Sequence, residues 1–148
     1  MKEISYVMIK PGFANLVPVI DEVKQRIFEA GLKITNEAFA VYSQGDVRKH
    51  YVEHLNREDY CELEKFIMSD KVYGMQVEGE DAIRVVRTIM GTAKDPAPGT
   101  IRHDIPEVLG IILPPTQNVA HASDSIEAAK RELAIFNEIV ERMSQEKY

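Results

Sequence analysis

His121 is the residue whose type and surroundings best suit covalent chemistry. It lies among small residues, in the segment 118–125, on a predicted extended stretch directly before a helix. Glu132 follows on that helix at the edge of its apolar stripe, so its carboxylate can turn back and accept a hydrogen bond from one ring nitrogen of His121. Such a bond fixes the tautomer and leaves the other nitrogen free, which makes a neutral imidazole a competent nucleophile. The segment also fits an ordinary helix-capping loop with an incidental histidine.

The remaining histidines and the cysteine carry weaker signals. His50 and His54 fall in a polar helical stretch, where a solvated histidine is expected, and His103 falls in a loop. Their spacing does not force a metal site with His121, and no pattern of cysteine, histidine or carboxylate residues resembles a metal cage. Cys61 is the single cysteine, so it forms neither an intramolecular disulfide nor a cysteine-based zinc site.

Three cations stand near the predicted ends of elements. Lys10 ends the first strand, Arg87 lies near the end of a helix, and Arg102 follows a Pro-Gly-Thr-Ile stretch. The sequence has neither a G-x-x-x-x-G-K-[ST] loop nor a G-x-G-x-x-G turn, the two commonest phosphate-binding loops. Each cation alone is typical of a surface charge. Their shared position at element ends favours a site for an anionic ligand.

The pattern of apolar residues predicts alternating strands and helices. Predicted strands cover Ile4–Ile9, Leu32–Tyr42 and Val72–Val77. Predicted helices run from near Pro18 to Gly31, over Asp46–Leu55, over Asp59–Ile67, and from Ala82 to Gly91.

The last third of the chain holds a long loop and a final helix. The segment from Thr92 to about Gln117 is rich in proline and glycine, and a loop of this length is usually functional or disordered. Within it, Val108–Leu113 is either a strand or part of the loop. Asp124 is the predicted cap of the final helix, with Glu127 three residues further on. The order of elements predicts an α/β (α+β) domain of the ferredoxin-like split βαβ type, a four-stranded antiparallel sheet with helices on its faces.

Length and composition predict one globular domain over residues 1–148. The chain weighs 16.8 kDa and has 45% hydrophobic and 28% charged residues, so it is neither disordered nor membrane-spanning. Eighteen basic against 24 acidic residues give a net charge of −6, which disfavours nucleic-acid binding but not a small anionic ligand. The beginning of the chain reaches polar residues too soon for a secretory signal, so a cytoplasmic location is expected.

Four blocks, in this order, resemble the nucleoside diphosphate kinase family. They are Met8-Ile9-Lys10-Pro11, His50-Tyr51, Pro98-Gly99-Thr100-Ile101-Arg102 and Asn118-x-x-His121-Ala122-Ser123-Asp124-Ser125. The resemblance runs from about Ile4 to Phe136, nearly the whole chain, and the last block is highly specific.

The resemblance implies a ping-pong transfer of the γ-phosphoryl group from a nucleoside triphosphate, with ATP as donor, to a nucleoside diphosphate. By this match His121 is the nucleophile, Glu132 orients its imidazole, and Ser123 assists through a hydrogen bond. Phosphoryl transfer depends mainly on positioning and on electrostatic stabilisation, so a histidine and converging cations suffice. The family uses Mg²⁺, which the nucleotide phosphates would mostly hold without a metal site on the protein.

The same match implies a set of nucleotide-binding residues and an assembly. Arg87 and Arg102 would hold the phosphates, Lys10 and Asn118 would contact the sugar hydroxyl and phosphate side, and Tyr51 would lie near the transferred group. The family also implies a homo-oligomer, a tetramer or a hexamer.

This chain departs from the family pattern at several places. Gly12 and Phe13 follow Lys10-Pro11 where the family usually has Asp and Gly. Asp59 aligns with the ring that normally stacks on the base, which leaves the neighbouring Tyr60 as a substitute.

The segment between the predicted helix that ends at Gly91 and the nucleophile His121 also differs from the family pattern. A threonine that contacts phosphate aligns near Ala93, so Thr92 would take its place after a shift of one residue. The segment from Gly91 to Arg102 is shorter than usual, and the segment from Arg102 to Asn118 is longer. These changes bear on base affinity and assembly more than on the phosphoryl chemistry.

Two other functions fit the sequence. The first is a catalytically impaired kinase-like protein that binds nucleotide or acts as a scaffold, which would bind nucleotide without carrying phosphate on His121. The second is a ferredoxin-like regulatory or nucleic-acid-binding module. The negative charge and the lack of a stripe of aromatic and basic residues count against the second.

Overall fold

A four-stranded antiparallel sheet forms the centre of the molecule, with the strand order β2-β3-β1-β4. The computed structural model describes residues 1–146, apart from the side chain of Pro115. The strands are β1 Lys2–Ile9, β2 Lys33–Ala40, β3 Val72–Glu80 and β4 Ala120–Ala122. All neighbouring strands are antiparallel, so the predicted sheet and the three predicted strands are confirmed.

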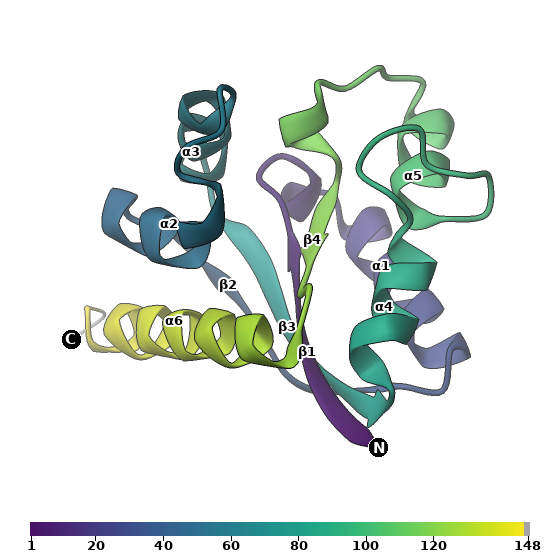
Figure 1. Cartoon of the computed structure of the whole chain (residues 1–148), viewed down its shortest axis with the longest axis horizontal. Coiled ribbons are helices and arrows are strands. Elements are labelled where there is room, and N and C mark those ends of the chain that lie inside the picture. The colour runs from purple at the N-terminus through teal and green to yellow at the C-terminus, as the bar shows by residue number, and fades with distance from the viewer. Residues whose placement is uncertain (147–148) are drawn as a thin grey trace.

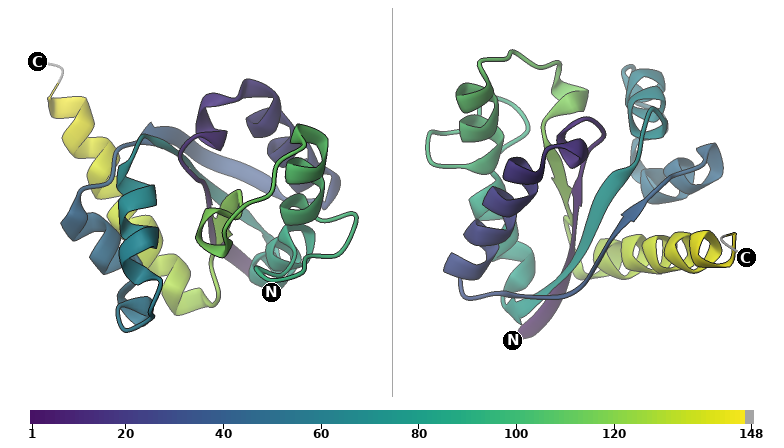
Figure 2. Two further views of the ribbon diagram at one scale, coloured as in Figure 1. Left: turned by 90° about the horizontal axis from the view of Figure 1, so that it is seen from above. Right: turned by 180° about the vertical axis from the view of Figure 1, so that it is seen from behind.

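Helices cover both faces of the sheet. They are α1 Val17–Glu29, α2 Gln44–His50, α3 Tyr60–Met68, α4 Ala82–Met90, α5 Ile101–Leu109 and α6 Ile126–Gln145. Three short 3-10 turns lie at Phe13–Asn15 (η1), Val52–His54 (η2) and Pro115–Gln117 (η3). Helices α1 and α4 pack on one face, whereas α6 lies across the other with α2 beside it (Figures 1 and 2). Among the described residues, no helix is both long and apolar enough to cross a membrane.

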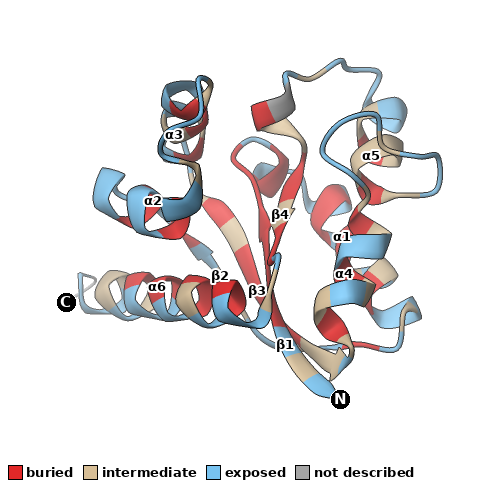
Figure 3. Cartoon of the chain, viewed as in Figure 1, coloured by how far each residue is buried: buried red, intermediate tan, exposed pale blue. Residues whose placement is uncertain are grey.

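The alternation of side chains along β1 separates two cores. Val7 and Ile9 belong to the cluster that includes α1 and α4, whereas Tyr6 and Met8 belong to the cluster with α2, α3 and α6. All four side chains are fully buried, and buried residues line the sheet and the inner faces of the helices (Figure 3). Because successive side chains of a strand point to opposite faces, β1 joins the two clusters and fixes the helices on both sides.

Two segments differ from the sequence-based expectation. The stretch from Thr92 to Gln117 is not one loop, because α5 forms within it and buries Ile101 and Ile105, one helical turn apart. Val108–Leu113 is not a strand: its first two residues end α5, and Ile112 is 100% exposed. Apolar character alone therefore does not determine the structure of this segment, which contributes little to the core.

The expected helix over Asp46–Leu55 is also divided. Helix α2 ends at His50, and the 3-10 turn Val52–His54 follows after Tyr51. Ser43 caps α2 by accepting a hydrogen bond from the Asp46 backbone N–H, while the Asp46 carboxylate accepts one from the Ser43 N–H. This break turns the chain between α2 and α3 and brings Tyr51 to the open end of the sheet.

The close approach of α6 to the sheet depends on Gly74. A Cβ atom at this position would lie 2.7 Å from Phe136 Cδ1 and 2.7 Å from the Tyr6 hydroxyl oxygen. We expect Gly74→Ala to lower the free energy of unfolding by about 1–3 kcal/mol, because both rings are buried and cannot move away freely. Urea denaturation checks this.

Gly45→Ala is the matched control. Gly45 is exposed in α2, and its added Cβ would have only the Ser43 hydroxyl at 3.9 Å as a neighbour. It should leave stability unchanged or raise it by about 0.5–1 kcal/mol. An unchanged unfolding midpoint for Gly74→Ala would show that the contact between α6 and the sheet is not tight.

Candidate active site

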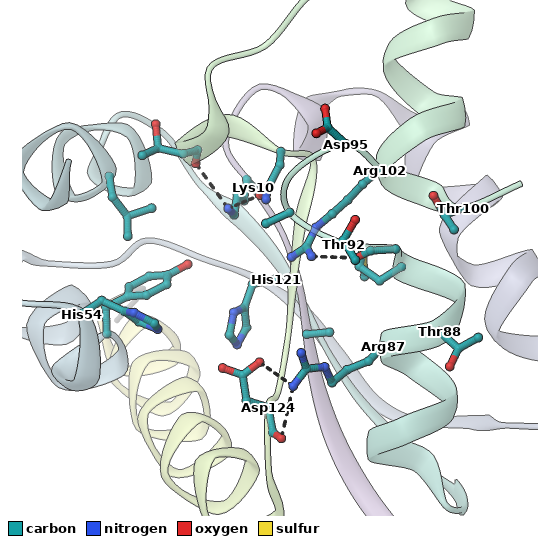
Figure 4. Close-up of a pocket in the computed structure, with 18 of the residues that line it drawn as sticks. Lys10, His54, Arg87, Thr88, Thr92, Asp95, Thr100, Arg102, His121 and Asp124 are labelled. Carbon is teal, nitrogen blue, oxygen red and sulfur yellow. Dashed lines mark hydrogen bonds and ion pairs between the residues drawn. The ribbon is translucent and has the colours of Figure 1, made fainter. Parts of the chain in front are cut away.

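A cavity of about 690 Å³ opens where the end of β1, β4, α4, α5 and the turn before α3 converge (Figure 4). Seven of the predicted site residues line it: Lys10, Tyr51, Arg87, Thr92, Arg102, Asn118 and His121. Ser123 and Glu132 are buried behind His121. The structure thus brings nine of the ten predicted residues together and leaves Tyr60 apart.

His121 is held from one side by a buried carboxylate. It pairs with Met8 across the sheet, and its Nε2 lies 2.8 Å from Glu132 Oε1. The Ser123 hydroxyl donates a hydrogen bond of 2.7 Å to the same oxygen and accepts one of 2.9 Å from the Tyr6 backbone N–H. Ser123 therefore acts on Glu132 rather than on the histidine. An ionised carboxylate only accepts, so the Nε2 of His121 carries the hydrogen and Nδ1 keeps its lone pair.

The surroundings keep the imidazole neutral. Burial, and next the charge of Lys10, lower the pKa of His121 to about 3, although Asp124 opposes the shift. Burial also raises the pKa of Glu132 above its ordinary value, and the hydrogen bond from Ser123 opposes that change. A neutral imidazole with a fixed tautomer results, which is the form that can attack an electrophile.

Two cations are fixed beside the histidine by backbone and amide oxygens. Lys10 is buried, and its Nζ donates to Asn118 Oδ1 at 2.6 Å and to the Thr116 carbonyl at 3.3 Å. Burial, and next the charge of Arg102, lower the pKa of Lys10 to about 7. Arg102 donates to the carbonyl oxygens of Gly91 and Ala120, each at 2.9 Å. Neither cation has a carboxylate partner among the described residues, which suits an anionic ligand.

Arg87 is held at the mouth of the cavity by an acidic partner. Its guanidinium lies 3.0 Å from Asp124 Oδ1, and both side chains are half-exposed. The prediction that Asp124 caps the final helix is wrong. Ser125 caps α6 by accepting a hydrogen bond of 3.0 Å from the Ala128 N–H, and this leaves the Asp124 carboxylate free to pair with Arg87.

A strained residue leads into β4. Val119 is fully buried with a φ of 71°, in the left-handed region that a β-branched side chain rarely adopts. Its carbonyl oxygen accepts a hydrogen bond of 2.9 Å from the Lys10 N–H, which fixes the strained turn to the end of β1. Such a conformation costs on the order of 1–3 kcal/mol and persists where the surroundings impose it.

The remaining predicted residues differ in their environment. Tyr51 is buried, with its ring centroid 5.8 Å from that of His121, and burial raises its pKa. Thr92 lines the cavity, and its hydroxyl donates to the Lys94 carbonyl at 2.7 Å. Tyr60 does not line the cavity, because its ring is buried in the core cluster of α2, α3 and α6. Leu63, one turn further along α3, lines the cavity instead.

Several cavity residues are absent from the sequence-based prediction. Arg57, Leu63, Asp95 and Asp124 line the cavity, and so does His54 from the turn before α3. Charge within a stretch between two predicted helices is a weak signal, because most such residues are solvated. For His54 and Arg57, the signal that could have found them is the helix break itself, which brings this turn over the end of the sheet.

The expectation of a solvated His50 is wrong. His50 is 1% exposed and its ring lies against those of Tyr51 and His121, with centroids 4.4 Å and 4.6 Å away. Its position one turn after the buried Val47 was the available signal. Potential ligand atoms of His50, His121 and Glu132 lie within 4.8 Å of one another. Two of these three residues, His121 and Glu132, are already hydrogen-bonded to each other in the structure.

Comparison with known proteins identifies the family. Residues 3–141 match the family model described as nucleoside diphosphate kinase. The chain belongs to the nucleoside diphosphate kinase family. Its activity is accordingly that of a nucleoside diphosphate kinase, a phosphotransferase that acts on nucleotides. This agrees with a cavity that places cations around a neutral histidine.

Relatives of this kinase cover most of its length. The nucleoside diphosphate kinase of Methanosarcina barkeri is 42% identical over 135 residues, which span 90% of this chain and 86% of the relative. That of Metallosphaera sedula is 39% identical over 142 residues, which span 93% and 96%.

Solved nucleoside diphosphate kinases share the fold. The halophilic enzyme of Halobacterium salinarum, in complex with CDP, has a TM-score of 0.80 and 34% identity, and the match covers 92% of this chain and 88% of that one. The Aquifex aeolicus enzyme has a TM-score of 0.79 and 26% identity, with coverage of 92% and 95%.

The buried hydrogen bond predicts how His121 titrates. We expect its ring to remain the neutral Nε2–H tautomer from pH 8 down to pH 5, because burial and Lys10 hold its pKa near 3. Nitrogen-15 NMR of labelled histidine measures this, and His121→Gln assigns the signal. A protonation step near pH 6.5, the ordinary value, would contradict the electrostatic account.

Proposed function

We propose that His121 carries the phosphoryl group between two half-reactions of this nucleoside diphosphate kinase. The observation that supports this most is the bond from Nε2 to Glu132, which leaves Nδ1 with its lone pair beside a cavity lined by cations. Nδ1 attacks the γ-phosphorus of a nucleoside triphosphate while the bond to the bridging oxygen breaks and the diphosphate leaves. A second diphosphate then attacks the phosphohistidine, and Nδ1 recovers its lone pair.

Three cations of the cavity bind different phosphates of the nucleotide. Arg102 and Lys10 are fixed beside His121, where negative charge gathers on the transferred oxygens. Arg87 is more exposed and lies nearer the mouth, which suits the phosphates of the leaving diphosphate. Asn118, which accepts from Lys10, suits the sugar side, while Tyr51 and Thr92 close the cavity around the transferred group.

Magnesium fits this site as part of the nucleotide complex. Mg²⁺ prefers oxygen ligands and usually binds through phosphates, water and one or two carboxylates. Among the described residues the cavity offers the carboxylates of Asp95 and Asp124, and the latter is paired with Arg87. When bound, the ion neutralises charge on the phosphate oxygens. The protein's own residues then orient the phosphate chain toward His121.

The substrates we propose are nucleoside triphosphates, with ATP as the donor, and nucleoside diphosphates. The CDP complex of the halophilic neighbour supports a nucleotide in this fold. The net charge of −6 disfavours a nucleic-acid partner. A cytoplasmic location is proposed because nucleotides and free Mg²⁺ are available there.

We also propose a homo-oligomer, a tetramer or a hexamer. Strand β2 is an edge of the sheet and exposes 42% of Phe39, while Val108 and Ile112 are 85% and 100% exposed near the end of α5. Exposed apolar groups at a sheet edge and around the end of a helix are typical of surfaces that a partner covers.

Labelled ATP separates chemistry from binding. After brief exposure to γ-labelled MgATP, the chain should carry one alkali-stable, acid-labile phosphate on His121, located by mass spectrometry. His121→Ala should abolish transfer but retain nucleotide binding, because the imidazole forms the covalent bond and is not the main phosphate clamp. Glu132→Gln should label more slowly. Nucleotide binding without label on the wild-type chain would favour the impaired, scaffold-like function instead.

Nucleotide affinity should depend on the charge of Lys10. Its pKa is about 7 in the empty site, and a bound phosphate raises it, so binding above pH 7 requires proton uptake. We expect ADP affinity to be highest near pH 7 and to fall by up to about tenfold per pH unit above it.

Calorimetry in buffers of different ionisation enthalpy measures this proton uptake. Lys10→Met is the control, because it should bind ADP weakly with a flat profile between pH 7 and 9. A wild-type affinity that does not change over this range would mean that Lys10 is charged throughout.

A further inference from the structure

His50 is a buried group that the proposed chemistry does not use. It ends α2, is 1% exposed and is surrounded by rings. The centroids of Tyr6, Tyr42 and Tyr51 lie 5.8, 6.0 and 4.4 Å from that of His50. The ring of His121 packs against it edge to face at 4.6 Å. Water is therefore excluded from the side of His121 that faces α2.

Both nitrogens of His50 lack a hydrogen-bond partner in the described part of the chain. A neutral imidazole carries one N–H, and leaving it unpaired in a buried site is unfavourable, because the donor has lost its hydrogen bond to water. The carboxylate oxygen Oε2 of Glu132 lies 4.0 Å from His50 Nε2. A buried donor without an acceptor thus faces an anionic acceptor.

The second oxygen of Glu132 also has no hydrogen-bond partner among the described residues. Oε1 takes both short bonds, from His121 and Ser123. The described contacts of Oε2 are His50 at 4.0 Å and the Arg131 guanidinium at 3.9 Å, both beyond hydrogen-bond distance. A shift of about 1 Å by His50 or Glu132 would bring Nε2 and Oε2 to about 2.9 Å and satisfy both atoms.

We propose that His50 is a positioning residue for the phosphoryl transfer: its Nε2–H binds Glu132 Oε2 and holds the carboxylate between two histidines. With Oε1 on His121 and Oε2 on His50, the plane of the carboxylate is fixed, and so is the direction in which His121 presents Nδ1. A carboxylate held by one oxygen can rotate and carry the imidazole with it. This role rests on the proposed function of His121 and Glu132.

The charge state of His50 suits this role. Burial, and next the neighbouring His121, lower the pKa of His50 well below its ordinary value. The ring is therefore neutral and donates a hydrogen bond without adding a positive charge that would compete with His121 for Glu132. Arg131 is a cation that also faces Oε2, but its side chain is more exposed and also pairs with Glu53.

The test compares variants that keep the ring or the donor. His50→Phe keeps a planar ring and removes the N–H, whereas His50→Gln keeps a donor and loses the ring. The readouts are the single-turnover rate of His121 phosphorylation by MgATP and the ADP dissociation constant. We expect His50→Phe to slow phosphorylation on the order of 10-fold with little change in ADP affinity, and His50→Gln to recover part of the rate.

Tyr42→Phe is the matched control for damage to the core. It removes the buried 2.7 Å hydrogen bond between the hydroxyls of Tyr6 and Tyr42, next to His50, without touching Glu132. It should lower the melting temperature and leave the phosphorylation rate near that of the wild type. An equal loss of rate in Tyr42→Phe would mean that general loosening of this core, and not the N–H, explains the His50 variants.

A double-mutant cycle with Glu132→Gln tests whether His50 acts through the carboxylate. Since two donors face the Oε1 position, the amide oxygen takes that place and the NH₂ group faces His50, which then has no acceptor there. We therefore expect His50→Phe to cause no further loss of rate in the Glu132→Gln background.

The outcomes separate the two proposals. Additive losses in the cycle, or an unchanged rate in His50→Phe, would overturn the role of His50 while wild-type labelling of His121 still stands. Absence of label on His121 in the wild-type chain would instead overturn the proposed function itself.

Discussion

A hydrogen bond between a buried carboxylate and a neutral imidazole is the interaction on which this active site depends. It occupies one nitrogen of His121 and, by doing so, determines what the other nitrogen can do. The bond joins a three-residue edge strand to a helix, so both must be placed accurately. Pairing with β1 places the strand, and burial of Phe136 against Tyr6 places the helix. Most of the fold serves this alignment.

The site also concentrates unfavourable features. A buried lysine lies near a half-buried arginine, and a valine adopts a left-handed conformation beside them. Each feature lowers the stability of the empty protein, and the two continuous cores offset this cost. A polyanion that entered the cavity would remove part of the penalty, because its charge would stabilise both cations. On the proposed function, affinity for nucleotide and instability of the empty site thus have the same electrostatic origin.

The sequence predicted this architecture unevenly, for physical reasons. The strands follow from the local periodicity of apolar residues, and the contact between His121 and Glu132 follows from their spacing. Both are present in the structure. His50 was misjudged because burial depends on what packs over α2, and its polar neighbours in sequence are exposed on the opposite side. Predicting that Ser125, and not Asp124, caps α6 would have required knowing that Arg87 lies beside Asp124. Helix α5 was missed because its buried face amounts to two isoleucines within a proline-rich segment.

The guanidinium of Arg102 links the 91–100 segment to the cavity proposed to bind nucleotide. By donating to the carbonyl oxygens of Gly91 and Ala120, it ties the start of the 91–100 segment to the strand that bears His121. Its charge is thereby immobilised before any phosphate arrives, so little side-chain entropy is lost on association. Conversely, if the hydrogen bond between Arg102 and the Gly91 carbonyl broke and the segment moved away, the guanidinium would no longer be fixed in the cavity. If Arg102 binds the phosphates as proposed, local opening of the segment and release of nucleotide form one linked equilibrium.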